Sequence, residues 1–167
     1  MNITDPNIYE YFADDRTILS MLSVNKKFRD EKLFQRIIER KYPLLIEFKK
    51  PNETWQHFFV NMTYYIHKLN EDYEIPYIPT KGYDPRVIFN SWDKYNRSMK
   101  YAAQGGSLDL VKFFISKGAN NREMGMRGAA QGGSLDLVKF FINKGAENWD
   151  IGMSCLLYTS PSPRDRS

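Results

Sequence analysis

The sequence has few of the residues that build catalytic and metal sites. It contains one cysteine, Cys155, and two histidines among its 167 residues. A single cysteine cannot form an internal disulfide, so we expect a reducing, intracellular compartment. His57 and His67 are ten residues apart, a spacing that points them in different directions around a helix. We therefore do not expect them to share a metal.

Motifs for nucleotide chemistry and nucleophilic catalysis are also lacking. The sequence has no cysteine cluster, no His-x-x-x-His pair and no glycine loop followed by Gly-Lys-Ser/Thr. The stretch 104–107, Gln-Gly-Gly-Ser, fits a turn between two helices better than a phosphate loop, because no strand precedes it. Catalysis needs converging polar groups. The sequence therefore predicts a protein that is not an enzyme and that uses no cofactor or metal.

Long apolar runs and a strong excess of one charge are absent too. No stretch approaches the roughly 18 uninterrupted apolar residues of a membrane-spanning helix. Asp5 and Asp14 lie where a signal peptide would have a basic start and an apolar run. The formal net charge is +4, from 24 Lys and Arg against 20 Asp and Glu. Dedicated nucleic-acid binders concentrate more positive charge on one face, so nucleic-acid binding is an alternative that we do not favour.

An internal repeat is the strongest pattern that is present. Residues 99–121 align with residues 126–148 at an offset of 27, and 19 of the 23 aligned positions are identical. The four differences are Lys100/Arg127, Tyr101/Gly128, Ser116/Asn143 and Asn120/Glu147. A third copy begins at Asn148 and then breaks off. Residues 156–167 turn to Ser, Pro and Arg, and we expect a non-native, disordered tail that resembles a translated sequencing adapter.

Each copy carries the capping chemistry of a helix pair. Ser107 and Ser134 predict N-caps for helices over 108–116 and 135–143. Glycines supply the tight turn before each cap and a left-handed stop after each helix. Small alanine pairs allow the first helix of a copy to approach its neighbour closely. The residues that define the repeat are Ala102, Ala103, Gly106, Leu108 and Gly118, with Ala129, Ala130, Gly133, Leu135 and Gly145 in the second copy.

The second helix of each copy is apolar around much of its circumference. In the first copy one stripe consists of Leu108, Val111 and Ile115, widened by Leu110, Phe113 and Phe114. Such a helix must be covered on both flanks, so the pairs are predicted to stack side by side. At the end of the last complete copy we expect Val138, Phe141 and Ile142 to be exposed, because no full repeat follows.

The part before the repeat is predicted to consist of four helices. Their N-caps are Asp5, Asp14 or Asp15, Asp30 and Asn52. The apolar faces of the four are Ile8, Tyr11 and Phe12; Ile18, Leu19 and Leu22; Leu33, Phe34, Ile37 and Ile38; and Trp55, Phe58, Phe59, Met62, Tyr65, Ile66 and Leu69. No segment alternates convincingly as a strand would, so the fold class is all-α.

Prolines and a glycine at positions 76, 79 and 82 mark the domain boundary. We expect a small helical domain over 1–75, a connecting segment over 76–95, repeats over 96–155 with the third truncated, and the tail over 156–167.

The repeat resembles the core of the ankyrin repeat. The pattern Ala-Ala-x-x-Gly-x-Leu-Asp-Leu-Val-Lys, followed by Lys-Gly-Ala, covers residues 100–119 and 127–146. The period is 27 instead of about 33, and Met-Gly-Met at 124–126 replaces the Thr-Pro-Leu-His turn. This short form looks most like repeats in ankyrin proteins of giant DNA viruses. The resemblance implies an α-solenoid that binds a protein target in the host cytoplasm.

The segment 24–29, Val-Asn-Lys-Lys-Phe-Arg, followed by Leu33-Phe34, resembles the F-box. In that family a three-helix unit docks on the adaptor subunit of cullin–RING ubiquitin ligases through its apolar opening helices. The resemblance implies that Phe12 and Leu19 contact the adaptor. The chain departs from the family where Asp5-Pro6 replaces the usual Leu-Pro and where the opening segment is about one helical turn shorter.

Together these patterns predict a protein-interaction module that recruits a substrate to a cullin–RING ligase. An alternative is an ankyrin-like scaffold or decoy that holds a host protein without any ligase. Tyr101, Arg122 and Arg127 vary between copies or lie at the loop and first helix, where solenoids usually vary to bind. We expect them to contact the target.

Overall fold

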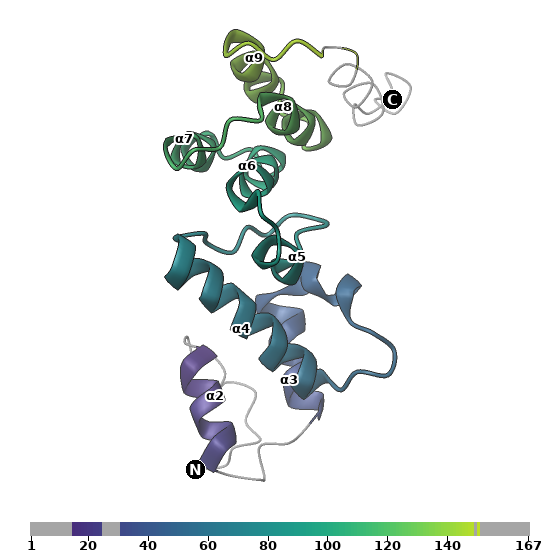
Figure 1. Ribbon diagram of the computed structural model, residues 1–167. Coiled ribbons are helices and arrows are strands. Elements are labelled where there is room, and N and C mark those ends of the chain that lie inside the picture. Colours follow the sequence, from purple (N-terminus) through teal and green to yellow (C-terminus); the bar gives the residue numbers. More distant parts are fainter. Residues whose placement is uncertain (1–14, 25–30, 149, 151–167) are drawn as a thin grey trace, which may run out of the picture.

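The computed structural model describes residues 15–24, 31–148 and 150. Within these ranges every regular element is a helix, which confirms the all-α class. Figure 1 shows the helices arranged along one direction, with α2 at one end and α9 at the other. The elements are α2 (Asp15–Val24), α3 (Glu31–Lys41), the 3-10 helix η2 (Pro43–Phe48), α4 (Trp55–Tyr73), α5 (Pro85–Phe89), α6 (Lys94–Gln104), α7 (Leu108–Ser116), α8 (Arg122–Gln131) and α9 (Leu135–Asn143).

One hydrophobic core lies between α3, η2 and α4. The predicted apolar face of α3 is buried against the predicted apolar face of α4. The two faces meet because their residues recur at helical spacing, so each helix has one side that must leave water. The buried members are Leu33, Phe34, Ile37, Ile38, Leu45, Phe58, Phe59, Met62 and Ile66.

The N-cap of α4 is Thr54, so the prediction of Asn52 was wrong. The Thr54 hydroxyl accepts a hydrogen bond from the His57 amide at 3.1 Å. Asn52 instead lies inside a turn that is closed by a bond from the Glu53 amide to the Lys50 carbonyl. That turn has to finish before the helix begins, which moves the cap two residues along the chain.

Helix α2 is fixed by a buried carboxylate. Asp15 is 5% exposed; its carboxylate accepts hydrogen bonds from the Lys41 ammonium at 2.8 Å and from the Tyr42 hydroxyl. Asp15 is the first residue of the helix and not its predicted N-cap, and its carboxylate ties α2 to the end of α3. Burial, followed by the bond to Asp15, raises the pKa of Tyr42. The helix predicted around Phe12, the cap candidate Asp14 and the cap candidate Asp30 lie outside the described residues.

The repeat forms two helix pairs, α6 with α7 and α8 with α9. Helices α7 and α9 have the predicted bounds. The Ser107 hydroxyl accepts from the Leu110 amide at 3.4 Å, and Ser134 occupies the same position in the second pair without a side-chain bond. The four glycines predicted to adopt left-handed or turn geometry have positive φ angles: Gly106 (75°), Gly118 (102°), Gly133 (71°) and Gly145 (91°).

Helix α8 packs directly on α6 through its glycines. A Cβ atom added to Gly128 would lie 2.1 Å from the Lys100 carbonyl oxygen, and one added to Gly132 would lie 2.1 Å from that of Gln104. Only hydrogen fits at these two positions, which are one helical turn apart. Ala102, Ala103, Ala129 and Ala130 are all fully buried around this contact. The two copies therefore lie side by side, with α6 and α8 in contact (Figure 1).

Equivalent side chains tie each copy to the turn that follows it. The Asn96 amide oxygen accepts hydrogen bonds from the backbone amides of residues 120 and 121, both at 2.9 Å. Glu123 stands 27 residues later, and its carboxylate accepts from the amides of residues 147 and 148, the first at 2.6 Å. The hydrogen bonds thus repeat with the same 27-residue period. The acceptor is the side-chain amide of Asn96 in one copy and the carboxylate of Glu123 in the next.

Two expectations about the apolar faces were wrong. On α7 the buried residues are Val111 and Phe114, whereas Leu108 and Ile115 are each 37% exposed. On α9, Val138 and Phe141 are buried instead of exposed. Their faces pack within the helix pair, where the Phe141 ring fills the space beside a glycine: a Cβ at position 125 would lie 2.3 Å from its Cζ atom.

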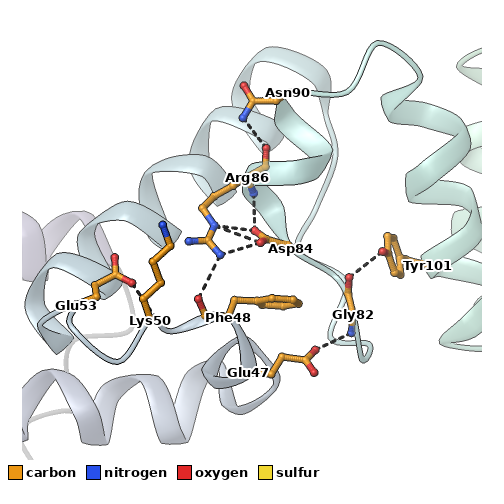
Figure 2. Close-up of polar contacts among 9 residues, drawn as sticks. All are labelled: Glu47, Phe48, Lys50, Glu53, Gly82, Asp84, Arg86, Asn90 and Tyr101. Atoms are coloured by element: carbon orange, nitrogen blue, oxygen red, sulfur yellow. Dashed lines mark hydrogen bonds and ion pairs between the residues drawn. The ribbon is translucent and has the colours of Figure 1, made fainter.

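The segment 76–95 is packed between the two parts of the molecule. Ile78, Tyr83 and Ile88 join the core formed by the repeats. Gly82 (φ 79°) links both sides: its amide donates to the Glu47 carboxylate and its carbonyl accepts from the Tyr101 hydroxyl, each at 2.8 Å (Figure 2).

Repeat-equivalent glycines provide a matched test of the α6–α8 contact. Gly132→Ala should lower the free energy of unfolding by about 2 kcal/mol or more, because the added methyl meets a backbone carbonyl that cannot move aside. Gly105→Ala should stay within about 0.5 kcal/mol of wild type. A Cβ atom added to Gly105 would lie 3.1 Å from the Thr80 methyl, which belongs to a side chain and not to the backbone. Both glycines have helical backbone angles, so the two substitutions differ only in what the new methyl meets. Urea unfolding followed by circular dichroism measures both, and equal losses would contradict the close contact.

Asn96→Ala removes the acceptor of two backbone amides and should lower the free energy of unfolding by about 1 kcal/mol. Asn96→Asp keeps an acceptor oxygen and should retain most of the stability, as Glu123 does in the second copy. If the alanine and aspartate variants unfold at the same urea concentration, the hydrogen bonds do not stabilise the junction.

Candidate protein-binding surface

Three cations form what we call the basic face, consisting of Arg97 and Lys100 on α6 and Arg127 on α8. Arg97 and Lys100 are three residues apart, so they lie on the same side of α6. Lys100 and Arg127 occupy equivalent repeat positions, so the packing of α8 on α6 places them on neighbouring helices. Arg127 is exposed, the Arg97 side chain is 42% exposed and Lys100 is half-buried.

The basic face is electrostatically unfavourable as it stands. Burial lowers the pKa of Lys100, and the positive charges of Arg127 and Arg97 lower it further. Arg97 donates through Nε to the Asp93 carboxylate at 3.0 Å, which leaves its two terminal amino groups without a protein acceptor among the described residues. In the same ranges Arg127 has no hydrogen-bond or ion-pair partner. A bound anion would relieve this repulsion.

An open cleft adjoins the basic face at the junction of α5 and α6. Its volume is about 470 Å³. Trp92 on its rim is 93% exposed and Val87 is 50% exposed. Arg97 belongs to both the cleft and the basic face. The lining residues are Asp84, Arg86, Val87, Asn90, Ser91, Trp92 and Arg97.

One wall of the cleft is held rigidly by an ion pair. The Asp84 carboxylate caps α5 by accepting from the Arg86 amide at 3.0 Å, and it also binds the guanidinium of the same residue at 2.8 Å. The guanidinium reaches the Phe48 carbonyl on η2 as well, at 3.4 Å (Figure 2). The hydrogen bond with Asp84 raises the pKa of Arg86. This arginine is committed to the fold, so Arg97 is the cation that the cleft offers to a partner.

The structure separates the residues predicted to contact a target. Arg127 lies on the basic face, and Arg122 is exposed at the start of α8. Tyr101 is directed to the connecting segment, where its hydroxyl binds Gly82 and its ring packs edge-on against Tyr83 with centroids 5.3 Å apart. Phe12 lies outside the described residues. So does the Leu19 side chain, although the backbone of α2 at that position is described.

Three residues of this surface were missed from the sequence. Lys100 could have been found, because it is one of the four differing positions and the charge is kept in both copies. Arg97 and Trp92 give no such signal. They precede the aligned repeat; the three-residue spacing could have placed Arg97 on the helix face of Lys100, whereas only the fold brings Trp92 beside Arg97.

Comparisons with protein-family models, with curated proteins and with solved structures found no match for this chain. Among the described residues no group of three or more His, Cys, Asp or Glu side chains could hold a metal ion. Both histidines lie on α4. The Nδ1 atom of His57 is 2.7 Å from the Glu53 carboxylate, and the Nε2 atom of His67 is 3.8 Å from the Asp15 carboxylate. In the same described ranges no helix has the length and apolar character needed to span a membrane.

The crowding on the basic face predicts that Lys100→Gln stabilises the folded chain. Because the folded state lowers the pKa of Lys100, it binds that proton less tightly than the unfolded state does. The wild type should therefore gain stability relative to the variant as the pH rises toward about 10, the ordinary lysine value. Thermal unfolding from pH 7 to pH 10 measures the gap, which should be largest at pH 7 and in low salt.

Lys112→Gln provides the matched control, because this lysine is exposed on α7 and does not belong to the basic face. If it stabilises the chain as much as Lys100→Gln does, the gain comes from net charge and not from the basic face.

Proposed function

We propose that this chain is a protein-interaction module whose basic face and adjoining cleft bind a target protein. The observation that carries the proposal is the placement of Lys100 and Arg127 side by side, with no acidic group among the charges that shift the pKa of Lys100. An almost fully exposed tryptophan, Trp92, lines the same cleft as Arg97 of the basic face and adds apolar surface of the kind that dominates binding energy at interfaces.

The resemblance to short ankyrin repeats supports this proposal. The second helices of the pairs, α7 and α9, begin after the predicted Ser caps, and α8 packs on α6 through small residues, as stacked repeats require. In such an arrangement the first helices form a continuous surface. The basic face lies on those helices, α6 and α8.

The finer proposal is that the module recruits its target to a cullin–RING ubiquitin ligase through the F-box-like region. Helices α2 and α3 lie at the end of the molecule opposite α8 and α9 (Figure 1). Two partners could bind these ends without colliding, and the link would raise the effective concentration of target at the ligase. The alternative, a scaffold or decoy, needs only the basic face.

Charge reversal tests the binding surface. The double variant Lys100→Glu, Arg127→Glu should weaken binding to the target by at least about tenfold, because close charge pairs at interfaces contribute strongly to affinity. The control is Lys112→Glu, Lys139→Glu, which makes the same change in net charge on the exposed sides of α7 and α9. Quantitative pull-down of full-length chains from host lysate measures both. Equal loss with the two pairs would contradict a specific surface.

The ligase role has a separate test with the same full-length chains. The purified adaptor subunit should bind the wild type and the charge-reversed chain equally, and should bind Leu19→Asp at least about tenfold more weakly, because the resemblance assigns an adaptor contact to Leu19. Absence of any adaptor binding, while the target still binds, would favour the scaffold or decoy.

A further inference from the structure

The cleft and the basic face together form one continuous surface with two kinds of chemistry. Arg97 lines the cleft beside Trp92, and it also lies one helical turn before Lys100 on α6. From Lys100 the surface continues to Arg127 on α8. A partner that follows this path meets apolar surface first and positive charge afterwards.

The apolar part of this surface consists of the Trp92 and Val87 side chains, which a partner side chain could contact. Trp92 is 93% exposed and Val87 is 50% exposed on the rim of a cleft of about 470 Å³. A tryptophan buries a large area when it is covered, and truncation of such residues at interfaces often costs tenfold or more in affinity. Nothing else in the described part of the chain covers this ring. Trp92 and Val87 therefore suit an apolar side chain of a partner, whereas the other lining residues of the cleft are polar.

The charged end selects carboxylates that are spaced apart. Neighbouring packed helices have axes about 8–10 Å apart, and the glycine contact of α8 with α6 is a close one. A peptide in the polyproline II conformation advances about 3.1 Å per residue with three residues per turn, so side chains three positions apart lie on one face and match this spacing. Carboxylates at such positions would pair with Lys100 and Arg127.

We propose that the partner is an acidic segment of a protein in the polyproline II conformation, with an apolar side chain seated against Trp92 and Val87 and with carboxylates three residues apart on Lys100 and Arg127. This assignment rests on the proposed function and names the chemistry of the target.

A nucleic acid fits the same surface less well. Its phosphates repeat at every nucleotide, so a strand that follows the path from the basic face would also meet the carboxylate of Asp84 at the cleft. A peptide can place an uncharged side chain there. The positive charge of the basic face would attract both ligands. The exposed apolar surface of Trp92 and Val87 in a cleft that also holds a carboxylate favours the peptide.

Selection from a random peptide display library against the full-length chain tests the assignment. Enriched peptides should carry an apolar residue followed by Asp or Glu at positions three apart. A synthetic peptide made from the enriched pattern should lose affinity about tenfold or more for Trp92→Ala, and about tenfold or more for the pair Lys100→Gln, Arg127→Gln. Trp92 is nearly fully exposed, so its removal should leave the folding of the chain unchanged.

Two controls match these variants in chemistry but lie elsewhere. Tyr64→Ala removes an aromatic side chain that is 50% exposed on α4, and Lys112→Gln, Lys139→Gln removes two positive charges from α7 and α9. Both should bind the peptide as tightly as the wild type does. If the charge variants lose binding but Trp92→Ala does not, the apolar anchor is refuted while the basic face survives. If no variant changes the selection, or no peptide is enriched, the proposed function fails as well.

Two further experiments test whether a nucleic acid or a second copy of the chain occupies this surface instead. A labelled single-stranded oligonucleotide that binds at physiological salt more tightly than the selected peptide would overturn the assignment in favour of a polyanion. Sedimentation of the chain alone should give a monomer. A dimer that dissociates on Trp92→Ala would show that a second copy covers the cleft, and would overturn the assignment to a separate partner.

Discussion

The packing of α8 on α6 depends on two hydrogen atoms. Gly128 and Gly132 present no side chain where the carbonyl oxygens of Lys100 and Gln104 lie, and any larger residue would push the helices apart. This approach sets the distance between the repeat copies. It also determines how far the side chains on α6 lie from those on α8. The basic face is therefore a consequence of backbone contact as much as of charge.

The same contact explains why the basic face costs stability. Lys100 is half-buried because α8 comes so close, and its charge then lies near two arginines. A chain under selection for stability alone would place a neutral side chain there. The second copy has Arg127 at the equivalent position, so positive charge is kept although the residue type changes. Groups that oppose folding and are retained are typical of binding surfaces.

Local chemistry could be predicted from the sequence, and long-range packing could not. The bounds of α7 and α9 follow from Ser caps and glycine stops, which act over one turn. The predictions of the N-cap of α4 and of the buried sides of α7 and α9 were wrong because these features depend on neighbouring parts of the chain. The turn around Asn52 must close before α4 begins, and the Phe141 ring is buried in the space beside Gly125. For the same reason the cleft beside Trp92 could not be predicted, since α5 and the connecting segment carry no repeat.

Variation between the repeat copies has two different causes. Tyr101 differs from Gly128 because of position in the stack: the tyrosine binds the connecting segment through Gly82, whereas the glycine must admit the backbone of α6. Such a difference reflects packing and does not by itself indicate a partner. The difference between Lys100 and Arg127 is of another kind, because the residue type changes while the positive charge is kept. Positive charge that both copies keep without an acidic partner among the described residues is therefore a better guide to a binding surface in this chain than variation is.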